Sequence, residues 1–143
     1  MLKKDYTAKL LNLEDVIITK VENISEEVHV YLELPRVKHR CPACGALTDR
    51  VHDYGMQIIK DVPLGRTTLL HLRKRRYRCN CGKRFFEKNT FLPRYYRSTS
   101  RLVAEIITAF CETVSASKIG TQFNVSGTTA MRYLVHYCPN RYK

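Results

Sequence analysis

Hydrophobic and polar residues alternate along the N-terminal part of the chain. Every second residue from Val28 to Leu34 is apolar, and polar or aromatic residues stand between them. This period of two is typical of a β-strand with one buried face, and Pro35 ends it. Residues 16–34 therefore predict two strands joined by a turn at Glu22–Glu27, preceded by a short helix or irregular segment over residues 1–15.

The middle of the chain predicts a second hairpin. Ile58 and Ile59 indicate a strand that Pro63 stops, Leu64–Gly65 supply a turn, and a second strand runs over residues 67–78. Cysteine pairs flank this hairpin, in CPACG at residues 41–45 and in RCNCG at residues 78–82, and a glycine follows each pair. The order of cysteine turn, hairpin and cysteine turn is the layout of a zinc ribbon.

From Ser100 onward the apolar residues recur every three or four positions, which is the period of a helix. We expect Ser100 to cap a first helix that ends near Thr113. Residues 115–123 and 126–137 predict two further helices, joined by a turn in which Asn124 is left-handed.

These elements predict an α+β protein, in which a β-rich zinc-ribbon-like domain is followed by a small helical helix-turn-helix domain. We expect four segments: a lead-in and β-hairpin that packs on the zinc unit, the zinc-ribbon-like domain, a linker and the helix-turn-helix domain. Their expected bounds are residues 1–35, 36–90, 91–99 and 100–143.

Two cysteine pairs predict a structural zinc site whose ligands are Cys41, Cys44, Cys79 and Cys81. Zinc favours four thiolates in a tetrahedron, and two short turns can supply two each. A redox CxxC would instead stand at a helix start after a strand. The second pair here is a tighter CxC, so a nearby histidine remains an alternative ligand. The three candidates are His39, His52 and His71, whereas Cys111 and Cys138 are read as small core residues.

Positive charge is concentrated after residue 35. The formal net charge is +12, and residues 1–35 contribute −3 of it while the rest contribute +15. A field of this sign attracts polyanions, of which nucleic acid is the default. No apolar run reaches the roughly 18 residues that span a membrane, and the N-terminus lacks the apolar core of a secretory signal. We therefore expect a cytoplasmic protein with no membrane partner.

A basic strand and the third helix are predicted to bind double-stranded DNA. Residues 73–78, RKRRYR, would place cations on both faces of a strand, where burial is unfavourable, and the guanidinium fork suits phosphate. Arg132 is the candidate for a guanine contact near the start of the third helix. A solvated edge strand and a plain three-helix bundle are the alternatives. The predicted DNA-binding residues are Arg73, Lys74, Arg75, Arg76, Arg78, Lys83, Arg84, Arg94, Arg97, Ser126, Thr128, Thr129 and Arg132.

The sequence holds no recognisable catalytic pattern. The only acidic residues after the second cysteine pair are Glu87, Glu105 and Glu112, and metal-dependent phosphoryl chemistry needs a cluster of carboxylates. No Ser-His-Asp or phosphate-loop pattern is present either. We therefore expect no enzyme activity from these residues and no small-molecule substrate.

The segments CPACG, VHDYGMQIIKDVPL and HLRKRRYRCNCGKRFFEK, followed by a helix-turn-helix, resemble the N-terminal half of bacterial insertion-sequence transposases of the ISL-three type. The resemblance covers residues 38–137. It implies that the four cysteines hold zinc, that the DNA target is the terminal inverted repeats, and that a catalytic domain of RNase H-like fold with an acidic triad would follow this chain.

On this basis the expected function is recognition of transposon ends in transposition, a form of DNA recombination, by a DNA-binding portion that lacks its catalytic domain. The alternative is a free-standing zinc-ribbon and helix-turn-helix transcriptional regulator. The sequence also leaves a homo-oligomer open.

Overall fold

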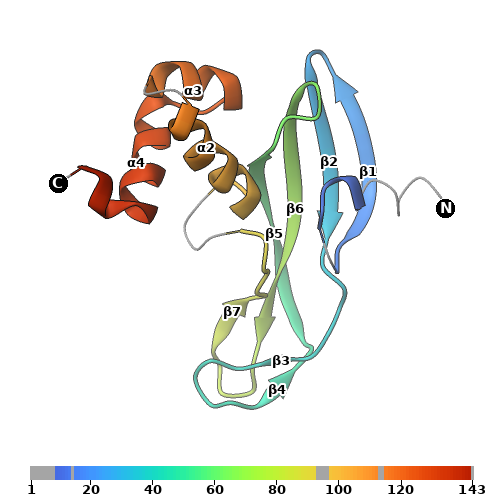
Figure 1. Ribbon diagram of the computed structural model, residues 1–143. Coiled ribbons are helices and arrows are strands. Elements are labelled where there is room, and N and C mark those ends of the chain that lie inside the picture. The colour runs from blue at the N-terminus through green and yellow to red at the C-terminus, as the bar shows by residue number, and fades with distance from the viewer. Residues whose placement is uncertain (1–8, 14, 93–96, 113–114, 143) are drawn as a thin grey trace.

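The computed structural model describes residues 9–13, 15–92, 97–112 and 115–142. In these residues a β-rich part is followed by helices, so the protein is α+β as predicted (Figure 1). The strands are β1 (Ile17–Ile24), β2 (Glu27–Glu33), β3 (His39–Arg40), β4 (Leu47–Thr48), β5 (Val51–Asp61), β6 (Thr67–Arg78) and β7 (Arg84–Phe86). The helices are α2 (Ser100–Glu112), α3 (Ala116–Phe123) and α4 (Gly127–Tyr137), and a 3-10 turn, η1, covers Pro139–Tyr142.

One twisted sheet runs through the β-rich part in the order β1-β2-β6-β5, and β7 pairs with the end of β6. Both predicted hairpins are present, since β1–β2 and β5–β6 are antiparallel. The strand β2 pairs in parallel with the first half of β6, from Thr67 to Arg73. The N-terminal hairpin therefore extends the same sheet beside the half of β6 that is remote from the cysteines.

The predicted alternation of β2 is present, because Val30 and Leu32 are buried while their neighbours are partly exposed. Their core continues across the sheet to Leu70 and Leu72 of β6 and Ile59 of β5. Leu11 and Leu13, from the segment before β1, are also buried in this core. The apolar residues of the lead-in thus cover one face of the sheet.

The buried face of β6 changes along the strand. Leu70 and Leu72 are buried in its first half, whereas Arg75 and Tyr77, on the opposite face, are buried in its second half. The Tyr77 ring lies 4.6 Å from the ring of His39 and 6.0 Å from that of Phe85, between centroids. The cysteine end of the sheet thus has a small core of its own, separate from the one under the N-terminal hairpin.

The helices α2, α3 and α4 pack around a second large core. Its buried residues are Leu102, Val103, Ile106, Phe110, Ile119, Phe123, Ala130, Tyr133 and Leu134. The cap of α2 is Thr99, one residue earlier than predicted, because its Oγ1 accepts the Leu102 N–H at 3.3 Å. Cys138 packs partly against this core, whereas the prediction that Cys111 is a core residue is wrong, since Cys111 is exposed.

A tight turn joins α3 to α4 as the sequence predicts. Asn124 is left-handed, with φ 55°, and Ser126 caps α4 by accepting the Thr129 N–H at 3.0 Å. Gly120 of α3 lies against this turn so closely that a Cβ there would stand 2.5 Å from the Val125 carbonyl oxygen. The absence of a side chain at Gly120 therefore sets how closely α3 approaches the turn.

Substituting Gly120→Ala should destabilise the protein, because the new methyl group meets rigid backbone. Overpacking of this kind costs about 2 kcal/mol, measured as a lower midpoint in urea unfolding. The matched control is Gly55→Ala in β5, where a Cβ meets its nearest atom, in the Phe86 ring, at 3.7 Å. Equal midpoints for the two variants would contradict the close approach at Gly120.

Backbone hydrogen bonds connect the segment before α2 to strand β5 of the sheet. The Lys60 N–H of β5 donates to the Arg97 carbonyl at 2.8 Å, and the Thr99 N–H donates to the Lys60 carbonyl at 3.0 Å. Asp61 then accepts hydrogen bonds from Thr99 and Arg101. Residues 97–101 therefore fix the helices beside one half of β5 (Figure 1). In the described residues, no helix is long and apolar enough to cross a membrane.

Candidate metal centre and nucleic-acid interface

Two small hairpins hold the cysteines at one end of the long sheet. The first turn lies between β3 and β4, where the Cys41 N–H donates to the Ala46 carbonyl at 2.8 Å and the Gly45 N–H to the Cys41 carbonyl at 2.9 Å. Gly45 has φ 76°, a left-handed conformation that glycine adopts without strain. Glycine at this position therefore allows the chain to bend around the first cysteine pair.

The second turn lies between β6 and β7 and is built in the same way. The Cys79 N–H donates to the Lys83 carbonyl at 2.9 Å, and the Gly82 N–H donates to the Cys79 carbonyl at 3.0 Å. Gly82 has φ 88°. Because the chain reverses within these residues, the tight CxC pair still directs both sulfurs, those of Cys79 and Cys81, toward the first turn.

The four sulfur atoms converge. All four Sγ atoms lie within 4.8 Å of one another, with 3.7 Å between Cys41 and Cys81 and 3.4 Å between Cys44 and Cys79. Zinc bonded to four thiolates at about 2.3 Å requires sulfur separations of about 3.8 Å. None of the four forms a disulfide. The arrangement therefore fits a tetrahedral zinc ion.

Charge at this cluster also favours a cation. The backbone N–H groups of Cys44 and Ala43 lower the pKa of the Cys41 thiol to about 6. The Ala46 N–H lowers the pKa of the Cys44 thiol, but the neighbouring sulfurs and burial outweigh it and raise that pKa to about 11. Four adjacent thiolates repel one another, so a divalent ion is needed to hold all of them ionised.

The three histidines considered as alternative ligands lie elsewhere. The ring of His39 lies tilted against that of Tyr77, with an interplanar angle of 45°. His52 is 3.9 Å from the carboxylate of Asp53, and His71 is hydrogen-bonded to His29 at 2.8 Å. Within the part of the chain that the structure describes, the cysteines form the only cluster with three or more metal-ligating side chains.

The basic run on β6 is less uniformly exposed than predicted. Arg73 and Arg78 are exposed, and the Arg73 guanidinium lies 3.8 Å from the centre of the Tyr54 ring. Lys74 donates to Gln57 Oε1 at 3.1 Å, and Arg76 forms a two-pronged ion pair with Asp53. Arg76 holds the pKa of Asp53 below its usual value.

The prediction that both faces of this strand are exposed is wrong at Arg75. Its side chain is buried and lies 3.5 Å from Glu87 Oε2, and it donates to the Leu34 carbonyl at 2.5 Å. Glu87, itself buried, also accepts the Arg75 N–H at 3.0 Å. A buried arginine is tolerated here because a carboxylate and a carbonyl satisfy it. Arg75 therefore holds β7 and the end of β2 on the sheet.

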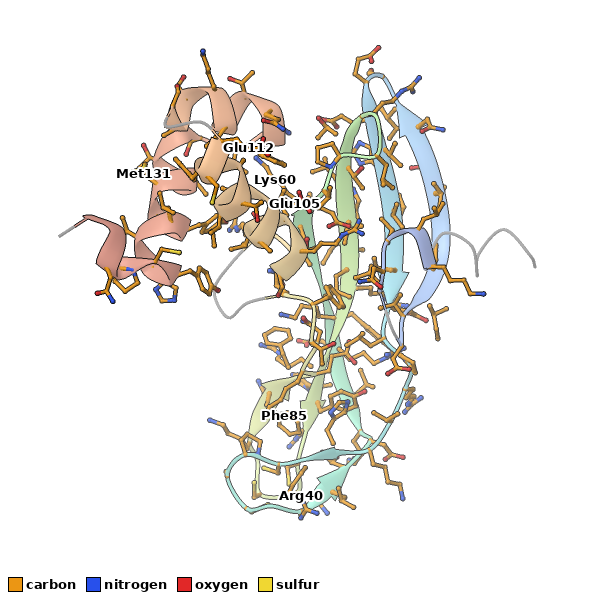
Figure 2. All side chains as sticks on the ribbon, in the orientation of Figure 1. Arg40, Lys60, Phe85, Glu105, Glu112 and Met131 are labelled. Atoms are coloured by element: carbon orange, nitrogen blue, oxygen red, sulfur yellow. The ribbon has the colours of Figure 1, made fainter. Side chains whose placement is uncertain are left out.

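The exposed cations nearest in sequence to the second cysteine pair are Arg78, Lys83 and Arg84. Arg40 belongs to the same end of the molecule (Figure 2) and donates to the Gly45 carbonyl at 2.9 Å. The cysteine turns thus hold a group of cations that face solvent.

At the start of α4, Ser126, Thr128 and Arg132 are exposed, while Thr129 is half-buried. Ser126 also donates to Thr129 Oγ1 at 2.8 Å, so both hydroxyls are engaged in the cap. Arg97 is exposed, and Arg94 lies outside the described residues.

Lys60 and Asp61 link the sheet to the helices, a role that was not predicted from the sequence. They sit at the end of a predicted strand, and their partners come from residues 97–101 and 124. No periodic signal connects such distant positions.

Comparison with known families identifies the cysteine segment. Residues 38–82 match the family described as the zinc-finger of transposase IS204/IS1001/IS1096/IS1165. The match begins just before β3 and ends after the second cysteine pair, so it contains both turns and the β5–β6 hairpin. Comparisons with curated proteins and with solved structures found no match. Residues 38–82 are therefore similar to the zinc-finger of these transposases, and the four converging cysteines they contain fit zinc as the cofactor.

Proposed function

We propose that this chain is a DNA-binding N-terminal part of a transposase and that it recognises the terminal inverted repeats of its transposon as double-stranded DNA. The family match over residues 38–82 is the observation that carries the proposal. The positive charge after residue 35 supports it, because duplex DNA is the polyanion on which a transposase acts.

The proposed DNA contacts come from two surfaces, one at the cysteine end of the sheet and one on the helices. Zinc bound by Cys41, Cys44, Cys79 and Cys81 braces the end of the sheet, where exposed arginines and lysines contact phosphates. The helices α3 and α4 act as a helix-turn-helix, in which Arg132 and Thr128 reach base edges in the major groove. The phosphate contacts supply affinity, and α4 supplies sequence preference.

We assign DNA strand cleavage to a catalytic domain outside these residues. Glu87 is buried beside Arg75, and Glu105 and Glu112 both lie on α2 (Figure 2). The cytoplasm, where bacterial DNA lies, is the location that this function requires.

A binding assay tests the proposal. A labelled duplex of the element's terminal repeat should bind more tightly than a scrambled duplex of the same length at every salt concentration, and binding to both should weaken as salt rises. Equal affinities for the two duplexes would contradict sequence-specific recognition.

Substituting Arg132→Ala should reduce this discrimination. Loss of one bidentate base contact costs about 1–3 kcal/mol on the specific duplex, or a Kd weaker by roughly fivefold to 150-fold, and much less on the scrambled one. The control is Lys20→Ala, since Lys20 is an exposed cation of β1, paired with Glu22. An equal loss on both duplexes would show that Arg132 contacts only the backbone.

A further inference from the structure

A polar hollow of about 600 Å³ lies where β5 meets the turn between α3 and α4. Its walls are Lys60 of β5, residues of α3, the turn and the first residues of α4. A second hollow of about 390 Å³ shares Lys60, Val125 and Ser126 with it and adds Arg97 and Arg132. The described residues that line the two hollows include no carboxylate.

Lys60 is held in place at both ends. Its backbone is bonded to residues 97 and 99, and its Nζ donates to the Asn124 carbonyl at 2.5 Å. An ammonium group has three donors, so two remain for a ligand. Figure 2 shows Lys60 beside the helices although it belongs to the sheet. Its ammonium group therefore stands at the helical turn without the flexibility of an ordinary surface lysine.

The cations around the hollows lack a compensating anion. Among the described residues, Lys60, Arg97 and Arg132 take part in no ion pair that the structure records. Asp61 is next to Lys60 in sequence, but it points to the other face of the strand and is bonded to Arg101. Three positive groups thus border the two adjoining hollows, which together form one polar groove. Lys60 comes from β5, Arg97 from the segment before α2, and Arg132 from α4.

The ligand that fits this groove is a phosphate group. The first N–H groups of a helix have no acceptor within the helix, and Gly127 and Thr128, which open α4, line the larger hollow. Helix N-terminal N–H groups and cations together suit a phosphodiester, which has one charge and two free oxygens. The groove adjoins the exposed Arg132, so a DNA strand can pass through it while α4 faces the bases.

We propose that Lys60, together with Arg97, binds a backbone phosphate of the DNA whose bases α4 contacts. This rests on the proposed function and adds a residue of the sheet to the contact surface of the helices. Because β5 and β6 continue to the cysteine turns, a DNA contact at Lys60 fixes the zinc unit relative to the same duplex.

The test is the salt dependence of DNA binding by Lys60→Gln. Each phosphate contact contributes about 0.9 to the slope of log Kd against log salt concentration. The slope for Lys60→Gln should fall by about 0.9 relative to the unsubstituted protein, equally on the terminal-repeat and scrambled duplexes. Lys60→Arg should keep the slope, because it keeps the charge. The matched control Lys20→Gln, in β1 on the edge of the sheet, should also keep it.

Three outcomes would overturn the inference. The first is an unchanged slope for Lys60→Gln, and the second is an equal fall for Lys60→Arg, which would indicate a packing role at Asn124. The third is stabilisation by inorganic phosphate that is lost in Lys60→Gln while the DNA slope stays unchanged, which would indicate a free-anion site. Failure of the proposed function is distinct, since it appears as absent or non-selective DNA binding by the unsubstituted protein.

Discussion

Substituting Cys44→Ser should abolish zinc binding and unfold the cysteine end of the sheet while the helical core stays folded. Serine keeps the size of the side chain but offers a hydroxyl in place of the thiolate that zinc requires. We expect about one equivalent of zinc in the unsubstituted protein and almost none in the variant. Metal analysis of protein purified without added zinc measures this directly.

The expected effect is large because little else holds that end together. Its buried side chains are few, chiefly Tyr77, Cys41, Cys79 and the Arg75–Glu87 pair. Structural zinc sites contribute on the order of 10 kcal/mol in small domains, which is comparable to the net stability of a whole domain. The main sheet core and the helical core lie elsewhere, so the loss should be local.

Hydrogen exchange locates the unfolding. Amides of β3, β4 and β7 should lose protection in Cys44→Ser, whereas those of α2 and α4 should keep it. The matched control is Cys111→Ser, an exposed cysteine outside the cluster, which should retain the metal and the protection. A well-folded unsubstituted protein with less than about half an equivalent of zinc would count against the site.

Local signals made much of this fold predictable. The cysteine turns could be predicted from the spacing of cysteine and glycine alone. The hairpins could be predicted from alternating apolar and polar residues on either side of a turn. The α3–α4 turn was predictable from Asn124, because asparagine tolerates the left-handed conformation that the turn requires. Each of these features is decided within a few residues of chain.

Contacts between distant segments were not predictable in the same way. The parallel pairing of β2 with β6 joins residues 27–33 to residues 67–73, and alternation does not specify a partner. The burial of Arg75 depends on Glu87, which comes from beyond the second cysteine turn. A run of basic residues is predicted to be exposed from sequence alone, because the carboxylate that allows one of them to be buried comes from a distant segment.

Asp61 provides the second test, because its substitution should release the helices from the sheet. Its side chain is fully buried and accepts hydrogen bonds from Arg101 Nε at 2.8 Å, Arg101 Nη2 at 2.9 Å and Thr99 Oγ1 at 2.6 Å. The backbone N–H of Val62 also donates to it at 2.8 Å. One carboxylate thus satisfies groups from both parts of the protein.

In Asp61→Ala the guanidinium of Arg101 loses its carboxylate and the Thr99 hydroxyl its acceptor. Removing one partner of a buried pair costs about 3–5 kcal/mol. Because Arg101 is partly exposed, we expect the free energy of unfolding to fall by about 3 kcal/mol, measured by urea unfolding. The matched control is Asp53→Ala, because the Asp53–Arg76 pair is similar in geometry but exposed, with the Asp53 side chain 42% accessible. Exposed ion pairs contribute little, so this control should change the unfolding midpoint only slightly.

Asp61→Ala also tests whether the helices are coupled to the zinc unit, separately from its effect on overall stability. Zinc content should stay unchanged in Asp61→Ala, since the cysteine turns do not contact Asp61, whereas amides of β5 near Asp61 and of the first turn of α2 should exchange faster. If α4 and the zinc unit bind one duplex, freeing one from the other also lowers DNA affinity by reducing the effective concentration of the second contact. Unfolding midpoints of Asp61→Ala and Asp53→Ala that agree within error would show that the helices are held to the sheet by other contacts.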